Sequence, residues 1–130
     1  MLRYLVLFGL LGFGYGLFAQ EQLLVLEAEA EFENIKVRKL SSSPEASAFV
    51  IWVKDTVKKH YHAEHTENLY ILEGEGVFYL GDKVYNIKAG DYFQIPKKSI
   101  HSVKVKSKIP LKALSVQSPE FLGKDRIFVD

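Results

Sequence analysis

The chain has 130 residues, of which 48% are hydrophobic and 25% are charged, so it is long enough for one domain with a core and too short for two domains of usual size. Its 17 Lys and Arg residues and 16 Asp and Glu residues give a formal net charge of +1. This balance excludes the strongly positive field typical of nucleic-acid-binding proteins, and we expect no nucleic-acid partner. The absence of cysteine excludes disulfides and thiolate ligands, so any metal must be bound by nitrogen and oxygen.

Residues 1–19 have the pattern of a secretory signal peptide. Arg3 precedes an uncharged apolar stretch from Tyr4 to Phe18, which is shorter than the ~20 residues of a membrane-spanning helix. We therefore expect cleavage after Ala19, a mature domain over residues 20–130, and export to the periplasm or the exterior. Retention of the stretch as a membrane anchor is the alternative, whereas cleavage leaves no stable anchor.

The chain after residue 19 is predicted to be all-β. No helical period continues over three turns, whereas short apolar stretches recur between turn sequences such as Ser41–Pro44. The expected strands are Leu23–Leu26, Glu31–Val37, Ala48–Val53, Leu69–Leu72, Val77–Leu80, Lys83–Ile87, Tyr92–Ile95, His101–Val105 and Leu111–Val116. Such a series fits a sandwich, a jelly roll or a small closed barrel. For residues 27–33, a short helix is the alternative prediction.

The distribution of histidines indicates a metal site. Alternate residues of a strand share a face, so His60 and His62 are expected to point to the same side. Glu67 follows a turn and can supply an oxygen from the neighbouring strand. His101 begins a strand whose odd positions are apolar, which places its imidazole inside. Three neutral imidazoles and a carboxylate are a suitable ligand set for a first-row divalent metal.

A solvated turn is the alternative for this cluster. His60, His62 and His65 lie beside Lys58 and Lys59, and their spacing alone leaves the two interpretations evenly matched. His65 has the opposite parity to the other two and follows an expected turn. We therefore expect His65 to be a hydrogen-bonding or solvent-exposed residue and not a metal ligand.

Two motifs extend the histidine pattern and carry a family resemblance. His60-x-His62-x4-Glu67-x6-Gly74 is followed by Gly90-Asp91-x3-Ile95-Pro96-x4-His101. Together they resemble the two motifs of the cupin superfamily, and the resemblance covers roughly residues 48–130. The chain is thus similar to a small single-domain cupin. This resemblance implies a double-sheet jelly-roll barrel, the double-stranded β-helix, with a site inside its open end.

The resemblance also implies a function. In cupins the residues that match His60, His62, Glu67 and His101 bind one divalent metal, here expected to be Fe(II) or Mn(II), with Ni, Cu or Zn as alternatives. Four protein ligands leave two positions of an octahedral metal for water, substrate or dioxygen. The implied function is a dioxygenase, decarboxylase, isomerase or lyase acting on a small oxygen-rich or aromatic molecule. A non-catalytic module that binds or senses a small molecule is the alternative, and no catalytic residue is assigned.

The N-terminal part of the mature chain suggests self-association. Many small cupins pair their barrels, and the segment Leu23–Val37 has more apolar surface than one thin barrel wall needs. We therefore expect a homodimer.

Overall fold

A computed structural model describes residues 20–130; the predicted signal peptide at residues 1–19 lies outside the described residues. Within residues 20–130 every regular element is a β-strand, and no helix there is long and apolar enough to cross a membrane. The strands are β1 Ile35–Ser43, β2 Ala46–Val53, β3 Thr56–Tyr61, β4 Thr66–Glu73, β5 Glu75–Leu80, β6 Lys83–Lys88, β7 Tyr92–Ile95, β8 His101–Val105, β9 Leu111–Ser118 and β10 Ile127–Phe128.

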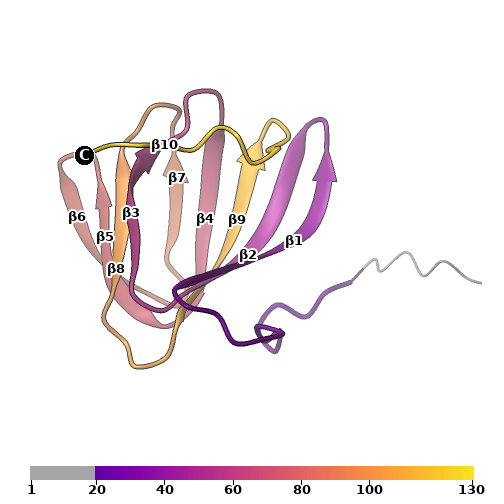
Figure 1. Cartoon of the computed structure of the whole chain (residues 1–130), viewed down its shortest axis with the longest axis vertical. Helices are drawn as coiled ribbons and strands as arrows, with labels where there is room; N and C mark the ends of the chain where they lie inside the picture. Colours follow the sequence, from indigo (N-terminus) through magenta and orange to yellow (C-terminus); the bar gives the residue numbers. More distant parts are fainter. Residues whose placement is uncertain (1–19) are drawn as a thin grey trace, which may run out of the picture.

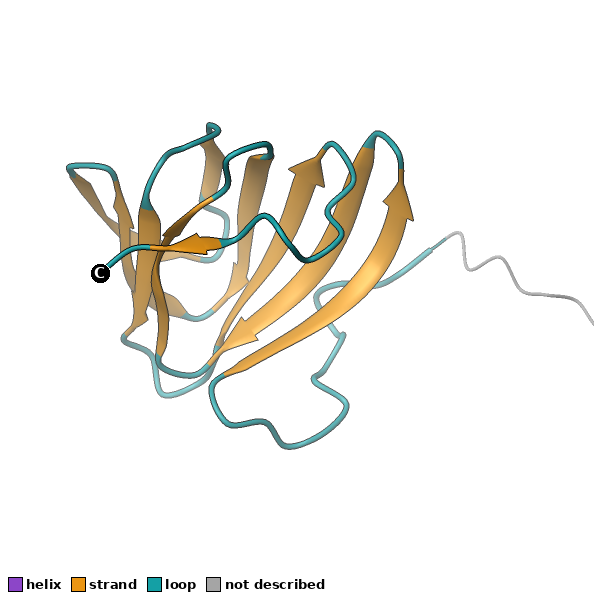
Figure 2. Ribbon diagram, turned by 45° about the horizontal axis from the view of Figure 1, so that its top comes forward, coloured by secondary structure: helices purple, strands orange, loops and turns teal. Residues whose placement is uncertain are grey.

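The strands form two five-stranded antiparallel sheets that face each other (Figures 1 and 2). One sheet has the order β1-β2-β9-β4-β7 and the other has the order β10-β3-β8-β5-β6. The chain crosses from one sheet to the other between β2 and β3, β3 and β4, and β4 and β5. Strands β5 and β6 then form a hairpin within the second sheet, and each strand from β7 to β10 again lies in the sheet opposite its predecessor. This double-sheet jelly roll confirms the predicted all-β class.

The structure corrects several predicted strands. Leu23–Leu26 is not a strand, because the chain turns there and the Val25 N–H donates to the Gln22 carbonyl at 3.2 Å. The strand expected from Glu31 begins at Ile35 and continues through Ser41–Ser43, which we had predicted as part of a turn. Strands β3 and β10 are missing from the list of expected strands, because β3 contains two lysines and β10 has two residues. The expectation that His60 and His62 share a face nevertheless assumed a strand at His60, and β3 contains this residue.

Parts of the segment of residues 20–34 contact the outer face of the first sheet. Val50 and Trp52 are buried although they alternate with the inward-facing Ile51 and Val53. The ammonium group of Lys112, which pairs with Trp52 on the neighbouring strand, donates to the Leu24 carbonyl at 3.2 Å. This contact fixes part of the segment that we expected to pair two barrels. The homodimer itself stays a prediction.

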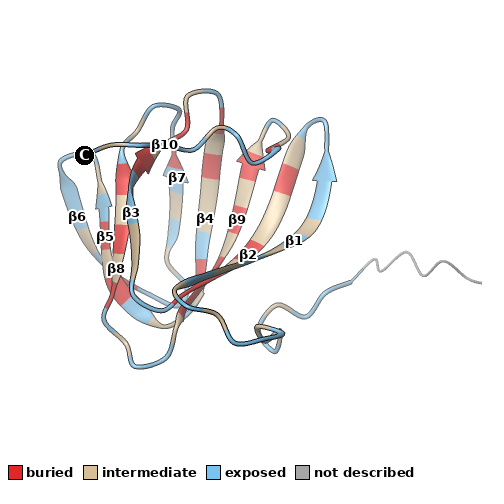
Figure 3. Ribbon diagram, viewed as in Figure 1, coloured by how far each residue is buried: buried red, intermediate tan, exposed pale blue. Residues whose placement is uncertain are grey.

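The hydrophobic core lies between the two sheets. Ile71, Phe78, Ile95 and Leu111 are buried and belong to one cluster contributed by both sheets. Figure 3 shows the buried positions, in red, on β2, β3, β4, β8 and β9. Because several core side chains also line the internal cavity described below, the packing that stabilises the barrel also shapes that cavity.

Candidate metal centre

A β-bulge in β3 turns His60 into the barrel. Val57 pairs with Val103 and His60 pairs with His101, so two residues of β3 lie opposite one residue of β8. Without this extra residue, Val57 and His60 would point to opposite faces of the sheet. With it, both side chains line the interior.

The other imidazoles come from the end of β3 and the start of β8. His62 follows the last residue of β3, and His101 is the first residue of β8. The Lys98 N–H, in the turn before β8, donates to the His62 carbonyl at 2.7 Å and ties the two segments together. The candidate nitrogen atoms of His60, His62 and His101 all lie within 4.8 Å of one another.

Each of these three imidazoles is oriented by a backbone carbonyl. The Nδ1 atom of His60 lies 2.8 Å from the Lys58 carbonyl, and that of His101 lies 2.9 Å from the Ser99 carbonyl. The Nδ1 atom of His62 lies 2.5 Å from the carbonyl of Asp125. A carbonyl only accepts hydrogen bonds, so Nδ1 carries the hydrogen in all three rings. In the neutral imidazoles the Nε2 atom therefore keeps a free lone pair.

Glu67 joins the three histidines from β4, in the opposite sheet. Its Oε2 atom lies 3.3 Å from the Nε2 atoms of both His62 and His101. Its Oε1 atom accepts a hydrogen bond from the Ser115 hydroxyl on β9. His60, His62, Glu67 and His101 each have between 2% and 5% of their surface exposed. The structure therefore brings together all four residues that the sequence analysis selected, in a buried cluster.

Burial and mutual charge set the protonation of this cluster. Burial, followed by the neighbouring His101, lowers the pKa of His60 to about 4. Burial acts in the same direction on His62, but the Glu67 carboxylate and the Asp125 carbonyl outweigh it and raise the His62 pKa. Burial would raise the pKa of Glu67, whereas the neighbouring His101 and His62 rings and the hydrogen bond from Ser115 hold it well below its usual range. Glu67 is therefore ionised at neutral pH.

The donor set fits a divalent metal ion. When they are neutral, the rings of His62 and His101 direct lone pairs at an ionised oxygen of Glu67, and this arrangement is repulsive unless a cation lies between them. The Nε2 atom of His62 is also buried without a hydrogen-bond partner. Three imidazole nitrogens and one carboxylate oxygen are ligands that first-row divalent metals accept. Metal binding by these four residues remains a prediction that the geometry supports.

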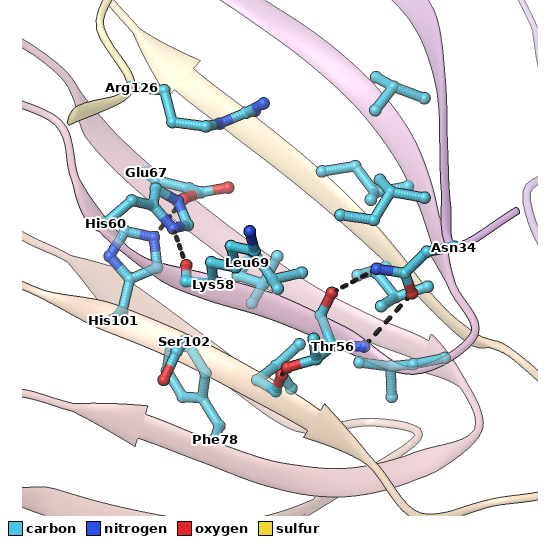
Figure 4. Close-up of a pocket in the computed structure, with 18 of the residues that line it drawn as sticks. Asn34, Thr56, Lys58, His60, Glu67, Leu69, Phe78, His101, Ser102 and Arg126 are labelled. Carbon is cyan, nitrogen blue, oxygen red and sulfur yellow. Dashed lines mark hydrogen bonds and ion pairs between the residues drawn. The ribbon is translucent and has the colours of Figure 1, made fainter. Parts of the chain in front are cut away.

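An internal cavity of about 360 Å³ borders the cluster (Figure 4). His60, Glu67 and His101 line it, whereas His62 approaches the cluster from outside the cavity. The wall is mostly aliphatic and aromatic. Its apolar members are Ile35, Val37, Ile51, Val53, Val57, Leu69, Phe78, Ile87, Val103, Leu111, Ala113 and Phe128. A small organic molecule in this space would touch both an apolar wall and the candidate metal-ligating groups.

His65 lies outside the cluster and helps to hold the C-terminal segment. Its Nδ1 atom lies 2.6 Å from the Asp125 carboxylate, and its Nε2 atom lies 2.9 Å from the Glu120 carbonyl. The same carboxylate accepts hydrogen bonds from the N–H groups of Ala63 and Glu64, both at 2.8 Å. His65 is thus a hydrogen-bonding residue in the structure, placed away from the three other imidazoles.

Asp125 connects the C-terminal segment to the cluster, and the sequence analysis did not select it. Its carboxylate fixes the turn that follows His62, while its carbonyl orients the His62 ring. Burial would raise the pKa of Asp125, but hydrogen bonds from His65, Glu64 and Ala63 lower it to about 2. No motif within the two histidine-containing segments points to a partner this far along the chain.

Comparison with known proteins places the fold in a family. The family model for the cupin domain matches residues 48–117. An uncharacterized protein of Aquifex aeolicus is 36% identical over 107 residues, which span 82% of this chain and 88% of that protein. Quercetin 2,3-dioxygenase of Bacillus subtilis is 32% identical over 53 residues, but these span 41% of this chain and 16% of that enzyme.

Solved structures agree with this assignment at the level of the fold. Streptomyces Pac13 with uridine superposes with a TM-score of 0.66 at 17% identity, covering 78% of this chain and 82% of Pac13. Pac13 is described as a nucleoside dehydratase. Sequence identity this low supports a shared fold and does not support a shared reaction. The matched family model, the Aquifex relative and the jelly-roll architecture together show that this chain belongs to the cupin family.

Proposed function

We propose that this protein is an exported, metal-dependent enzyme that converts a small molecule bound in the internal cavity. Its metal ligands are His60, His62, Glu67 and His101, and the expected metal is Fe(II) or Mn(II). The observation that carries the proposal is the convergence of free Nε2 lone pairs on an ionised oxygen of Glu67. Such a set of donors requires a cation, and three of the four residues border the cavity.

A bound divalent metal supplies Lewis-acid chemistry or, with iron or manganese, activation of dioxygen. The chain itself binds and orients. The carbonyls of Lys58, Ser99 and Asp125 hold the imidazoles in one tautomer, and the apolar wall excludes water from a bound substrate. Among the described residues that line the cavity, Glu67 has the only carboxylate. Acid–base chemistry without a metal therefore has few candidate groups, which supports a metal-dependent reaction.

The relatives support an enzyme and leave several reactions open. One relative is a dioxygenase and one solved neighbour is a dehydratase. We propose that the reaction of this chain falls among those of dioxygenases, decarboxylases, isomerases and lyases. Export, cleavage after Ala19 and the homodimer remain predictions.

Metal content provides the first test. We expect purified wild-type protein to bind one equivalent of Fe(II) or Mn(II), and His62→Ala and His101→Ala to lose most of that affinity because each removes a nitrogen ligand. His65→Ala is the control, since His65 contacts Asp125 and Glu120 and no other imidazole. Elemental analysis measures the metal content of each variant, and circular dichroism checks that the variant is folded. Loss of metal in His65→Ala together with retention in His101→Ala would contradict the ligand assignment.

Turnover separates an enzyme from a binding module. We expect metal-loaded protein to convert at least one compound from panels of small acids, sugars and catechols, and to lose this conversion after chelation. His101→Ala should be inactive under the same conditions, because it lacks a ligand that borders the cavity. Mass spectrometry detects the product. Saturable binding without any product would favour the non-catalytic module.

The pH dependence of metal binding follows from the imidazoles. Protons compete for Nε2, and His62 takes one at a higher pH than His60 because the His62 pKa is raised while that of His60 is lowered from 6.5 to about 4. Metal affinity should therefore fall as pH falls through the raised pKa of His62. NMR titration of the metal-free protein should give His60 the lower pKa of the two. The reverse order would contradict the described electrostatics.

These shifts have opposite effects on the stability of the metal-free protein. The lowered pKa of His60 makes a contribution to the free energy of unfolding that is complete above pH 6.5 and is lost as pH falls towards about 4. The raised pKa of His62 makes a contribution that is complete below pH 6.5 and is lost as pH rises through its folded-state pKa.

Asp125 should affect metal binding without touching the metal. Asp125→Ala removes the acceptor of three hydrogen bonds and releases the carbonyl that orients His62. We expect metal affinity to fall roughly 10- to 100-fold and thermal stability to decrease. Asp82→Ala, in the exposed turn between β5 and β6, is the matched control. Unchanged metal affinity in Asp125→Ala would show that the C-terminal segment has no positioning role.

A further inference from the structure

Two basic residues, both exposed to solvent, border the cavity beside the metal-ligating cluster. Arg126, which precedes β10, and Lys58, in the bulge of β3, both line it, and Figure 4 shows them on the same pocket as Glu67. The Arg126 guanidinium lies 5.9 Å from the centre of the Phe121 ring. Within residues 20–130 neither side chain forms an ion pair with a carboxylate. Both positive charges are therefore available to a ligand.

The carboxylate of Glu67 does not neutralise these two cations. Its Oε1 atom accepts from Ser115, and its Oε2 atom faces His62 and His101. Since Glu67 is the only carboxylate among the described lining residues, the cavity carries an excess of positive charge. Low-dielectric walls strengthen the attraction of such charge for an anion.

The rest of the wall selects against strongly polar ligands. Isoleucine, valine, leucine and phenylalanine side chains form most of it. A sugar would place hydroxyl groups against these side chains without hydrogen-bond partners, which is unfavourable. An apolar ring or chain would instead replace water at the same surface.

We propose that the cavity binds a small organic carboxylate with an apolar body, its anionic end held by Arg126 and Lys58. The planar guanidinium of Arg126 suits a carboxylate because it can donate two parallel hydrogen bonds. Lys58, which borders the cavity from the bulge of β3, adds a second charge. The proposal rests on the proposed function in assigning this cavity to the substrate, but the basic pair is present without a metal.

The test compares four probes by calorimetry. Phenylacetate has both the charge and the apolar ring, phenylacetamide has the ring without the charge, acetate has the charge without the ring, and glucuronate joins the charge to a polar body. We expect phenylacetate to have the highest affinity of the four, roughly tenfold or more above each of the others. A factor of about ten corresponds to the contribution of one charge-assisted hydrogen bond. Each titration uses Mn(II)-loaded protein and protein dialysed against a chelator, since a carboxylate can also bind a metal directly.

Variants assign the preference to the basic pair. In chelator-treated protein, Arg126→Gln and Lys58→Met should each weaken phenylacetate binding roughly tenfold and leave phenylacetamide unchanged. Arg126→Lys should retain part of the preference, and Lys83→Met, which removes an exposed charge away from the cavity, should retain all of it. Equal binding of phenylacetate and phenylacetamide, no binding of phenylacetate, or full binding by Arg126→Gln would overturn the proposal. Failure of every form to bind a metal would instead overturn the proposed function alone.

Discussion

The hydrogen bond from an imidazole Nδ1 atom to a backbone carbonyl is the interaction on which the candidate metal centre depends. It occurs in His60, His62 and His101, and the three carbonyls come from the bulge of β3, the C-terminal segment and the turn before β8. Each bond fixes both the tautomer and the direction of its ring. The centre therefore exists only where these three separate pieces of chain are held in place by the barrel.

The sequence predicted the principal part of this centre because strand alternation is a local property. His101 lies inside, as the apolar odd positions of its strand indicated. Glu67 returns on β4, the next strand along the chain, but this strand lies in the opposite sheet and is not a hydrogen-bonded neighbour of β3. The reasoning for the first pair was incomplete. His62 lies beyond the end of β3, and His60 faces the interior through a bulge next to Val57. Strand alternation predicted correctly that His60 and His62 point to the same side. It did not predict the bulge that places the side chains of Val57 and His60 on one face, because nothing in the sequence marks that bulge.

The contribution of the C-terminal segment could not be predicted in the same way. Asp125 is separated from His65 by several strands, and their contact depends on how the double-sheet barrel directs the chain after β9. The same holds for Lys112, whose burial depends on a segment of irregular structure near Leu24. Long-range contacts between polar groups leave no periodic pattern in the sequence, whereas the alternation of apolar residues in a strand is such a pattern.

The electrostatics of the cluster favour a metal over a proton as its resident cation. A proton on His62 removes one repulsive contact with Glu67, but leaves the neutral His101 directed at the same oxygen at 3.3 Å. A second proton would place two positive rings next to each other and near His60, whose pKa is already lowered by burial and by His101. A divalent ion can accept electron pairs from all three rings and the carboxylate at once. Protonation therefore satisfies this buried set of donors only in part, and metal binding satisfies it completely.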